Sequence, residues 1–125
     1  MESKAVTRLY GMLGFAMRAG KVIIGTELVC SSLPRRGKGS VELVLVSASA
    51  SQGTKKKMYT KCKFYGKELR EIAVDGDELG RLLGKTFAPM VVALSDPGFA
   101  TEIRKALDSM EEGALAKTER KEVSD

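Results

Sequence analysis

The residues best suited to chemistry lie at a predicted junction between a strand and a helix, Gly25-Thr26. Val22, Ile23 and Ile24 precede this junction, and β-branched residues favour a short strand. Gly25 can adopt backbone angles that other residues avoid, and Thr26 is a plausible N-cap for a helix that starts there. The free amides and the positive dipole end of that helix would attract a phosphate group. The junction therefore predicts contact with a nucleic-acid backbone, although Gly25 could instead serve only a tight turn.

A second candidate for phosphate chemistry is the run Gly80-Arg81-Leu82-Leu83-Gly84-Lys85-Thr86. A nucleotide-binding loop of this type requires four residues between its glycines and lies between a strand and the helix that it opens. Here three residues separate the glycines, and the run closes a predicted helix and leads into a strand. The sequence therefore argues against nucleotide hydrolysis.

Other catalytic constellations are not visible in the sequence. The chain has no histidine, the commonest general base, and no serine or cysteine has a visible base partner. Cys30 and Cys62 stand apart without the spacing of metal ligands, so we expect reduced, buried thiols rather than a disulfide or a metal site. No dinucleotide-binding GxGxxG motif follows a strand. We therefore expect a protein that is not an enzyme and that needs no cofactor.

The distribution of charge indicates a polyanionic partner. Residues 1–66 contain 12 lysines and arginines against 3 acidic residues, whereas residues 67–125 contain 9 against 13. A basic half on a small domain suits nucleic acid, but it could equally be a solvated surface that maintains solubility. No apolar run approaches the roughly 20 residues that a membrane span requires, and no signal peptide is visible. We therefore expect a cytoplasmic protein without a membrane partner.

The elements that would position the junction alternate between helices and strands. Helices are expected at about residues 3–17, 26–33 and 54–65, after a capping pattern at Asp75, and after Asp96-Pro97. Strands are expected at residues 22–24, 41–47, 69–74 and 90–94, and the second of these is almost entirely apolar. This order predicts an α/β fold, a three-layer α/β/α sandwich with a sheet of about four strands.

We expect one domain over residues 1–112. Residues 113–125 are charged and poor in apolar side chains, so they should form a frayed or disordered C-terminal tail. In the second predicted helix, Leu28, Val29 and Leu33 mark the buried side. The basic segment 35–40 that follows this helix should be a flexible loop, which could be no more than a solvated turn.

The order of these pieces resembles a known family. The segments that carry the likeness include Arg18-Ala19-Gly20-Lys21, Gly25 to Val29, Thr54 to Lys57, Leu79 to Lys85 and Val91 to Leu94. Together they resemble the bacterial YlxQ-type branch of the ribosomal protein L-seven-Ae/L-thirty-e family over about residues 4–107. The resemblance implies an L-thirty-e-like sandwich with a mixed sheet. It also implies a non-catalytic, ribosomal-protein-like function in binding kink-turn RNA, a sharply bent helix with tandem sheared G·A pairs.

The family's RNA-reading residues are only partly present at the junction. Kink-turn binders typically carry Gly-Thr-Asn-Glu there, with a lysine three residues after the glutamate. Gly25 and Thr26 match, but Glu27, Leu28 and Ser31 stand at the asparagine, glutamate and lysine positions. Leu28 cannot accept a hydrogen bond from guanine, and Glu27 adds a negative charge beside phosphates. This departure also looks typical of the YlxQ branch, and it leaves kink-turn selectivity open.

The resemblance implies a second contact at the loop after the glycine-rich helix. Its apolar members would pack against an everted nucleotide, and the loop comprises Lys85, Thr86, Phe87 and Ala88. Arg81, just before this loop, is a further candidate for RNA contact. Lys21, the Gly25-Thr26 turn and this loop all lie at one end of successive predicted elements, so we expect them to form one RNA-binding surface. Lys21 could instead be a solvated charge, and Phe87 could simply cover the edge of the core.

The expected partner is structured RNA, with the ribosome as one candidate, and we expect a monomer. A second class of function stays open, because the same fold could serve as a protein-interaction adaptor whose basic half meets an acidic partner.

Overall fold

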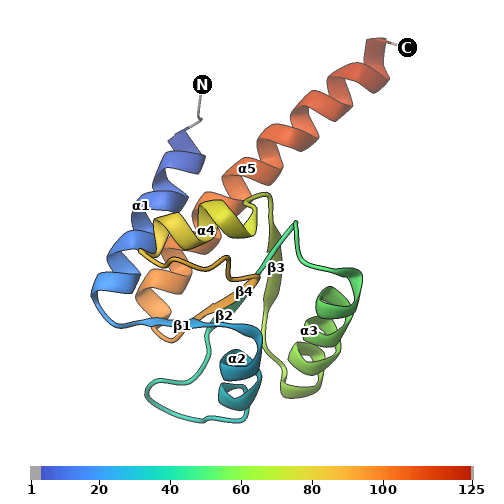
Figure 1. The fold of residues 1–125 in the computed structure, drawn as a ribbon. Coiled ribbons are helices and arrows are strands. Elements are labelled where there is room, and N and C mark those ends of the chain that lie inside the picture. Colours follow the sequence, from blue (N-terminus) through green and yellow to red (C-terminus); the bar gives the residue numbers. More distant parts are fainter. Residues whose placement is uncertain (1–3, 125) are drawn as a thin grey trace.

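The structure is a computed structural model that describes the backbone of residues 4–124 and the side chains of residues 4–110. Helices and strands alternate along this part of the chain (Figure 1). Their order is α1 (Lys4–Arg18), β1 (Val22–Ile24), α2 (Thr26–Ser32), β2 (Leu43–Ser47), α3 (Gln52–Tyr65), β3 (Leu69–Ile72), α4 (Gly76–Leu82), β4 (Val91–Leu94) and α5 (Pro97–Ser124).

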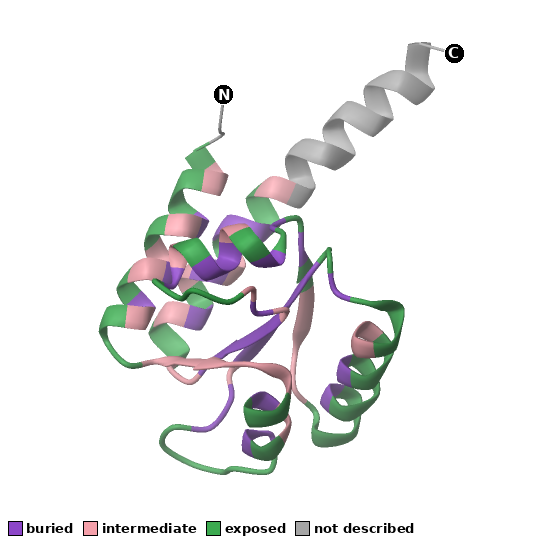
Figure 2. Cartoon of the chain, in the orientation of Figure 1, coloured by how far each residue is buried: buried purple, intermediate pink, exposed green. Residues whose placement is uncertain are grey.

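The strands form one mixed sheet in the order β1-β4-β2-β3. β4 pairs antiparallel with both β1 and β2, whereas β2 and β3 run parallel. Every residue of the two central strands, β2 and β4, is buried (Figure 2). This burial is expected for apolar strands that are covered on both faces. The mixed sheet that the family resemblance implies is confirmed.

Helices cover both faces of the sheet, with α1, α4 and α5 on one side and α2 and α3 on the other (Figure 1). Successive side chains of a strand point to opposite faces. Leu43 and Leu45 of β2 therefore pack in the cluster under α1, α4 and α5. Val44 and Val46 pack in the cluster under α2 and α3. The predicted three-layer α/β/α sandwich is confirmed.

Side-chain caps fix the starts of three helices. The Asp75 carboxylate accepts from the Glu78 amide at 2.8 Å, and the Asp96 carboxylate accepts from the Phe99 amide at 3.0 Å, as the sequence predicts for α4 and α5. α3 begins two residues earlier than predicted, because the Ser51 hydroxyl accepts from the Thr54 amide at 3.1 Å. These caps satisfy amides that have no acceptor within the helix.

The C-terminal segment that the sequence predicts as a tail, residues 113–125, lies outside the residues whose side chains are described. The tail and the domain boundary at residue 112 therefore stay predictions. A search of the described residues finds no helix that is both long and apolar enough to cross a membrane.

The structure places both cysteines as free thiols. Cys62 is buried in the core, whereas Cys30 is half-buried and its Sγ lies 3.6 Å from the Met58 Sδ. Burial, with a smaller contribution from Cys30, raises the pKa of the Cys62 thiol from about 9 to about 11. The folded protein therefore keeps this proton in a pH range where the unfolded chain releases it.

We expect this shift in pKa to make the fold weaker in alkali. The stability that the protonated thiol contributes is fully present below about pH 9 and is lost as the pH rises to about 11. Urea denaturation at a series of pH values should show that the parent loses about 1–3 kcal/mol more than Cys62→Ala across this range. The parent and the variant share every other side chain, so the difference between their losses reports on Cys62. Equal losses in the two proteins would show that the thiol is not responsible.

Candidate nucleic-acid interface

The Gly25-Thr26 turn and the loop that ends at Met90 meet at one end of the sheet. The Gly25 amide donates to the Val91 carbonyl at 2.8 Å. Ile24 faces Val92 in the antiparallel pairing of β1 with β4. The turn that follows β1 therefore lies beside the segment that leads into β4. The structure brings together two of the segments that the sequence singles out.

The backbone of Gly25 holds the turn in a conformation that favours glycine, with φ 103° and ψ 145°. Gly25 itself is the N-cap of α2, because its carbonyl accepts the first helical hydrogen bond from the Val29 amide at 3.0 Å. The prediction that Thr26 is the N-cap is therefore wrong by one residue. No side chain caps α2. Its first amides therefore have neither an acceptor within the helix nor a side-chain cap, as an anion-binding helix start requires.

The side chains at the selectivity positions of α2 face outward. The carboxylate of Glu27 is 90% exposed and pairs with Lys57 of α3 at 3.3 Å. Leu28 is 53% exposed, so the prediction that it lies on the buried side of α2 is wrong, whereas Val29 and Leu33 are buried as predicted. Ser31 is also exposed, and its hydroxyl donates to the Leu28 carbonyl at 3.0 Å. A helix of two turns has room for only a narrow buried stripe, which Val29 and Ser32 occupy, and the buried Leu33 follows directly at the helix end.

The loop before β4 is seated directly on helix α4. A Cβ placed on Gly80 would lie 2.3 Å from the Phe87 carbonyl oxygen, so only a glycine allows this approach. Pro89 is buried, whereas Lys85, Thr86 and Phe87 are exposed and Ala88 is half-buried. With 56% of its surface exposed, Phe87 does not serve mainly as a cover for the core edge. The backbone of the loop is held in place while its side chains face solvent.

Arg81 stands on α4 just before this loop. Its guanidinium pairs with the carboxylate of Glu78, one turn earlier on the same helix. The Arg81 side chain is 70% exposed, so it remains accessible from solvent. An exposed pair of this kind contributes little to stability and is easily exchanged for another partner.

Lys21 does not join the turn and the loop. Its carbonyl accepts from the Ser95 amide at 3.0 Å, and Val22 faces Leu94 at the far end of β4. Strand β1 therefore runs between Lys21 and the Gly25 turn, and the two lie at opposite ends of the sheet. The prediction that Lys21 gathers with the other candidate residues is wrong.

The structure adds the start of α3 to the same end of the sheet. The Ser47 amide, at the end of β2, donates to the Met90 carbonyl at 2.8 Å. The Ser49 hydroxyl then accepts from the Gly76 amide at 3.0 Å, which ties the turns after β2 and β3 together. Helix α3 therefore starts close to the loop and carries three consecutive lysines, Lys55, Lys56 and Lys57, near its beginning. The lysine run is visible in the sequence, but its place beside the loop depends on the strand order.

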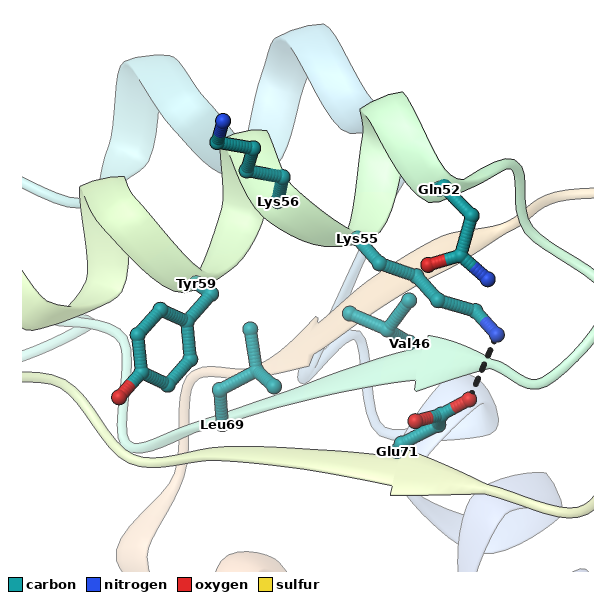
Figure 3. Close-up of a pocket in the computed structure, with 7 residues that line it drawn as sticks. All are labelled: Val46, Gln52, Lys55, Lys56, Tyr59, Leu69 and Glu71. Carbon is teal, nitrogen blue, oxygen red and sulfur yellow. Dashed lines mark ion pairs between the residues drawn. The ribbon is translucent and has the colours of Figure 1, made fainter.

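A pocket of about 320 Å³ opens between α3 and the edge strand β3 (Figure 3). Lys55 pairs with Glu71 across it at 2.7 Å, and Tyr59 stands at its other end beside Leu69. This pocket therefore offers one ion pair and an aromatic wall. Over the residues that the structure describes, no group of three or more histidine, cysteine or acidic side chains could hold a metal ion.

Comparison with known proteins finds a family that matches most of the chain. The profile of the ribosomal protein L7Ae/L30e/S12e/Gadd45 family matches residues 7–104. The chain belongs to this family. The family resemblance predicted from the ordered segments is thereby confirmed, and the L7Ae/L30e/S12e/Gadd45 match spans both the Gly25-Thr26 turn and the loop before β4.

Individual proteins are also similar to this chain over most of its length. The RNA-binding protein YlxQ of Bacillus subtilis (strain 168) is 38% identical over 102 residues, which are 79% of this chain and 94% of that protein. The large ribosomal subunit protein eL30 of Sulfolobus acidocaldarius is 35% identical over 88 residues, 70% of this chain and 82% of that protein. A solved structure from Bacillus halodurans C superposes with a TM-score of 0.72 at 31% identity and covers 81% of this chain and 97% of its own.

Proposed function

We propose that this protein is a non-catalytic RNA-binding protein that docks structured, kink-turn-type RNA on its turn-and-loop surface. The turn-and-loop surface is the surface formed by the Gly25-Thr26 turn and residues 85–88. The observation that carries the proposal is the 2.8 Å bond from the Gly25 amide to the Val91 carbonyl, which sets the uncapped start of α2 beside the loop. The names of the relatives, an RNA-binding protein and a ribosomal protein, support the same conclusion.

Each part of the turn-and-loop surface has a role in this proposal. Phosphates would accept hydrogen bonds from the first amides of α2 and pair with Lys85, because such contacts supply affinity. The exposed ring of Phe87 would stack on an everted nucleotide, with Ala88 beside it. Arg81 would exchange Glu78 for a phosphate. The partner would be ribosomal or other structured RNA in the cytoplasm, bound by a monomer.

Selectivity for a kink-turn over other structured RNA should be modest. The kink-turn pattern of the family has asparagine and glutamate where this chain has Glu27 and Leu28. An apolar Leu28 offers no acceptor to guanine, while the ion pair with Lys57 offsets part of the repulsion between Glu27 and phosphate. The first turn of α2 would then bind the RNA backbone more than it reads the bases.

Salt dependence tests this proposal. If three or more cations neutralise phosphates, the slope of log affinity against log salt should be steeper than about −2, measured by filter binding with a kink-turn RNA. Lys85→Ala should make the slope shallower by about 1. Lys21→Ala, which changes the same side chain at the far end of β1, should leave the slope unchanged.

A flat salt plot for the parent protein would contradict the RNA-binding proposal. Pull-down of partners with and without nuclease treatment then separates the two classes of function. Partners that persist after the RNA is destroyed would favour the adaptor function.

A further inference from the structure

A second basic and aromatic surface lies where α2 and α3 end. α3 starts beside the turn-and-loop surface, runs back along the sheet, and ends at Tyr65, where Gly66 turns the chain with φ 68°. α2 packs against α3, and its end lies at the same far end of the sheet. A pocket of about 380 Å³ opens between these two helix ends, and we call it the Phe64 pocket. Its polar and aromatic lining comprises Arg35, Arg36, Phe64, Tyr65 and Lys67.

The aromatic rings of the Phe64 pocket are open to solvent. Phe64 is 80% exposed, and Tyr65 is 38% exposed. The two ring centroids lie 4.9 Å apart with an interplanar angle of 84°, an edge-to-face contact that leaves a face of Phe64 free. A ring so exposed contributes little to the core, and it is held in place at a helix end. It is therefore suited to stack on a flat ligand.

The cations of the Phe64 pocket have no acidic partner among the ion pairs described for residues 4–110. Arg35 and Arg36 are exposed, and Lys67 is half-buried. The acidic residue next in the chain, Glu68, is engaged by Arg104 at 2.8 Å and by Arg70 at 3.5 Å. The pocket therefore carries uncompensated positive charge, which attracts a polyanion.

We propose that the Phe64 pocket binds an unpaired nucleotide of single-stranded RNA. The base would stack on Phe64, and the flanking phosphates would pair with Arg35, Arg36 and Lys67. Single-strand binders combine a basic groove with aromatic rings in this way, and the stacking is tolerant of sequence. The volume of about 380 Å³ lies at the lower end of the roughly 300–1,000 Å³ range of small-ligand pockets, as one nucleotide requires.

The groove along α3 gives the strand a path away from the Phe64 pocket. A hollow lined by Lys67, Lys63 and Tyr59 adjoins it between α3 and β3. Tyr59 also closes the pocket of Figure 3, whose α3 wall includes Lys56 near the start of the helix. Cations and exposed rings therefore alternate along the length of α3. This alternation favours a nucleic-acid strand over an acidic peptide, because every nucleotide supplies both a phosphate for a cation and a base that can stack on a ring.

Anisotropy of a labelled 12-nucleotide oligouridine with the full chain at low salt tests the proposal. We expect Phe64→Ala to weaken binding by about 5- to 150-fold, the effect of losing one stacked base. Phe15→Ala is the matched control, because Phe15 is 51% exposed on α1 and packs against Arg18 instead of lining the pocket. The control should bind oligouridine like the parent. Circular dichroism should show that both variants keep the parent fold.

Binding at the Phe64 pocket does not depend on the turn-and-loop surface, and a second RNA distinguishes the two binding surfaces. Phe64→Ala should retain affinity for a blunt kink-turn RNA, whereas Lys85→Ala should weaken that affinity and leave oligouridine binding within about twofold. Unchanged oligouridine affinity in Phe64→Ala would overturn the inference. Displacement of oligouridine by polyglutamate as efficient as by unlabelled oligouridine would also overturn it, since charge alone would then explain binding.

Discussion

Replacing Gly80 with alanine should destabilise the fold by about 1–3 kcal/mol and weaken RNA binding at the same time. The added Cβ would lie 2.3 Å from the Phe87 carbonyl oxygen and 3.3 Å from the Pro89 Cδ. Neither atom is the end of a flexible side chain, so the loop must move away from α4. That movement would displace the exposed ring of Phe87 from the turn-and-loop surface. Urea denaturation and RNA titration of the same variant measure both effects.

The matched control for this change is Gly11→Ala in helix α1. Gly11 is exposed and has no neighbouring atom within 4 Å of an added Cβ, so the same substitution should stabilise the protein by about 0.5–1 kcal/mol. Its RNA affinity should match that of the parent. Parent-like stability and affinity in Gly80→Ala would contradict the seating of the loop on α4.

The triple variant Glu27→Asn, Leu28→Glu and Ser31→Lys should prefer a kink-turn over its unkinked mutant by roughly tenfold or more beyond the parent's preference. Glutamate at position 28 supplies an acceptor for guanine donors, and lysine at position 31 adds a cation one turn further along α2. A good bidentate base contact is worth about 1–3 kcal/mol of discrimination in the DNA major groove, which serves as a guide for this bent RNA. Leu28 is 53% exposed, so the new carboxylate would remain in water and should not unfold α2.

The deciding measurement is the ratio between the variant's affinity for the kink-turn RNA and its affinity for the unkinked mutant RNA. Glu27→Asn releases Lys57 from its ion pair, and a free lysine should raise the affinity for both RNAs alike. Leu28→Gln is a suitable control, because it makes the position polar without adding a carboxylate. A triple variant that melts like the parent and gains no selectivity would show that these positions do not read RNA.

The sequence alone was sufficient for the architecture of the domain. The apolar run at 41–47 identifies the buried central strand, and the acidic residues before α4 and α5 identify their caps, because these are local signals. The ordered set of segments further identifies the family that the profile match confirms.

The candidate site could be predicted only in part, because its assembly depends on strand pairing. Lys21 and Gly25 flank the predicted strand 22–24, but only the antiparallel pairing of β1 with β4 shows that the loop before β4 meets Gly25 and not Lys21. Leu28 has the residue type of a buried position but stands just outside the narrow stripe of a short helix. The pocket that Phe64 lines with Arg35 and Arg36 gave no signal, since it depends on where the end of α2 lies relative to α3.

The position of β4 has a consequence for how the chain can fold during its synthesis. β4 is the last strand in the sequence, yet it lies between β1 and β2 in the sheet. A nascent chain that has not reached Val91 can form the parallel pair of β2 with β3, but β1 has no strand to join. The edge of β2 that β4 will cover stays open, and an open apolar edge is prone to wrong pairing. The sheet is therefore completed from its centre, in a late step that depends on contacts distant in sequence.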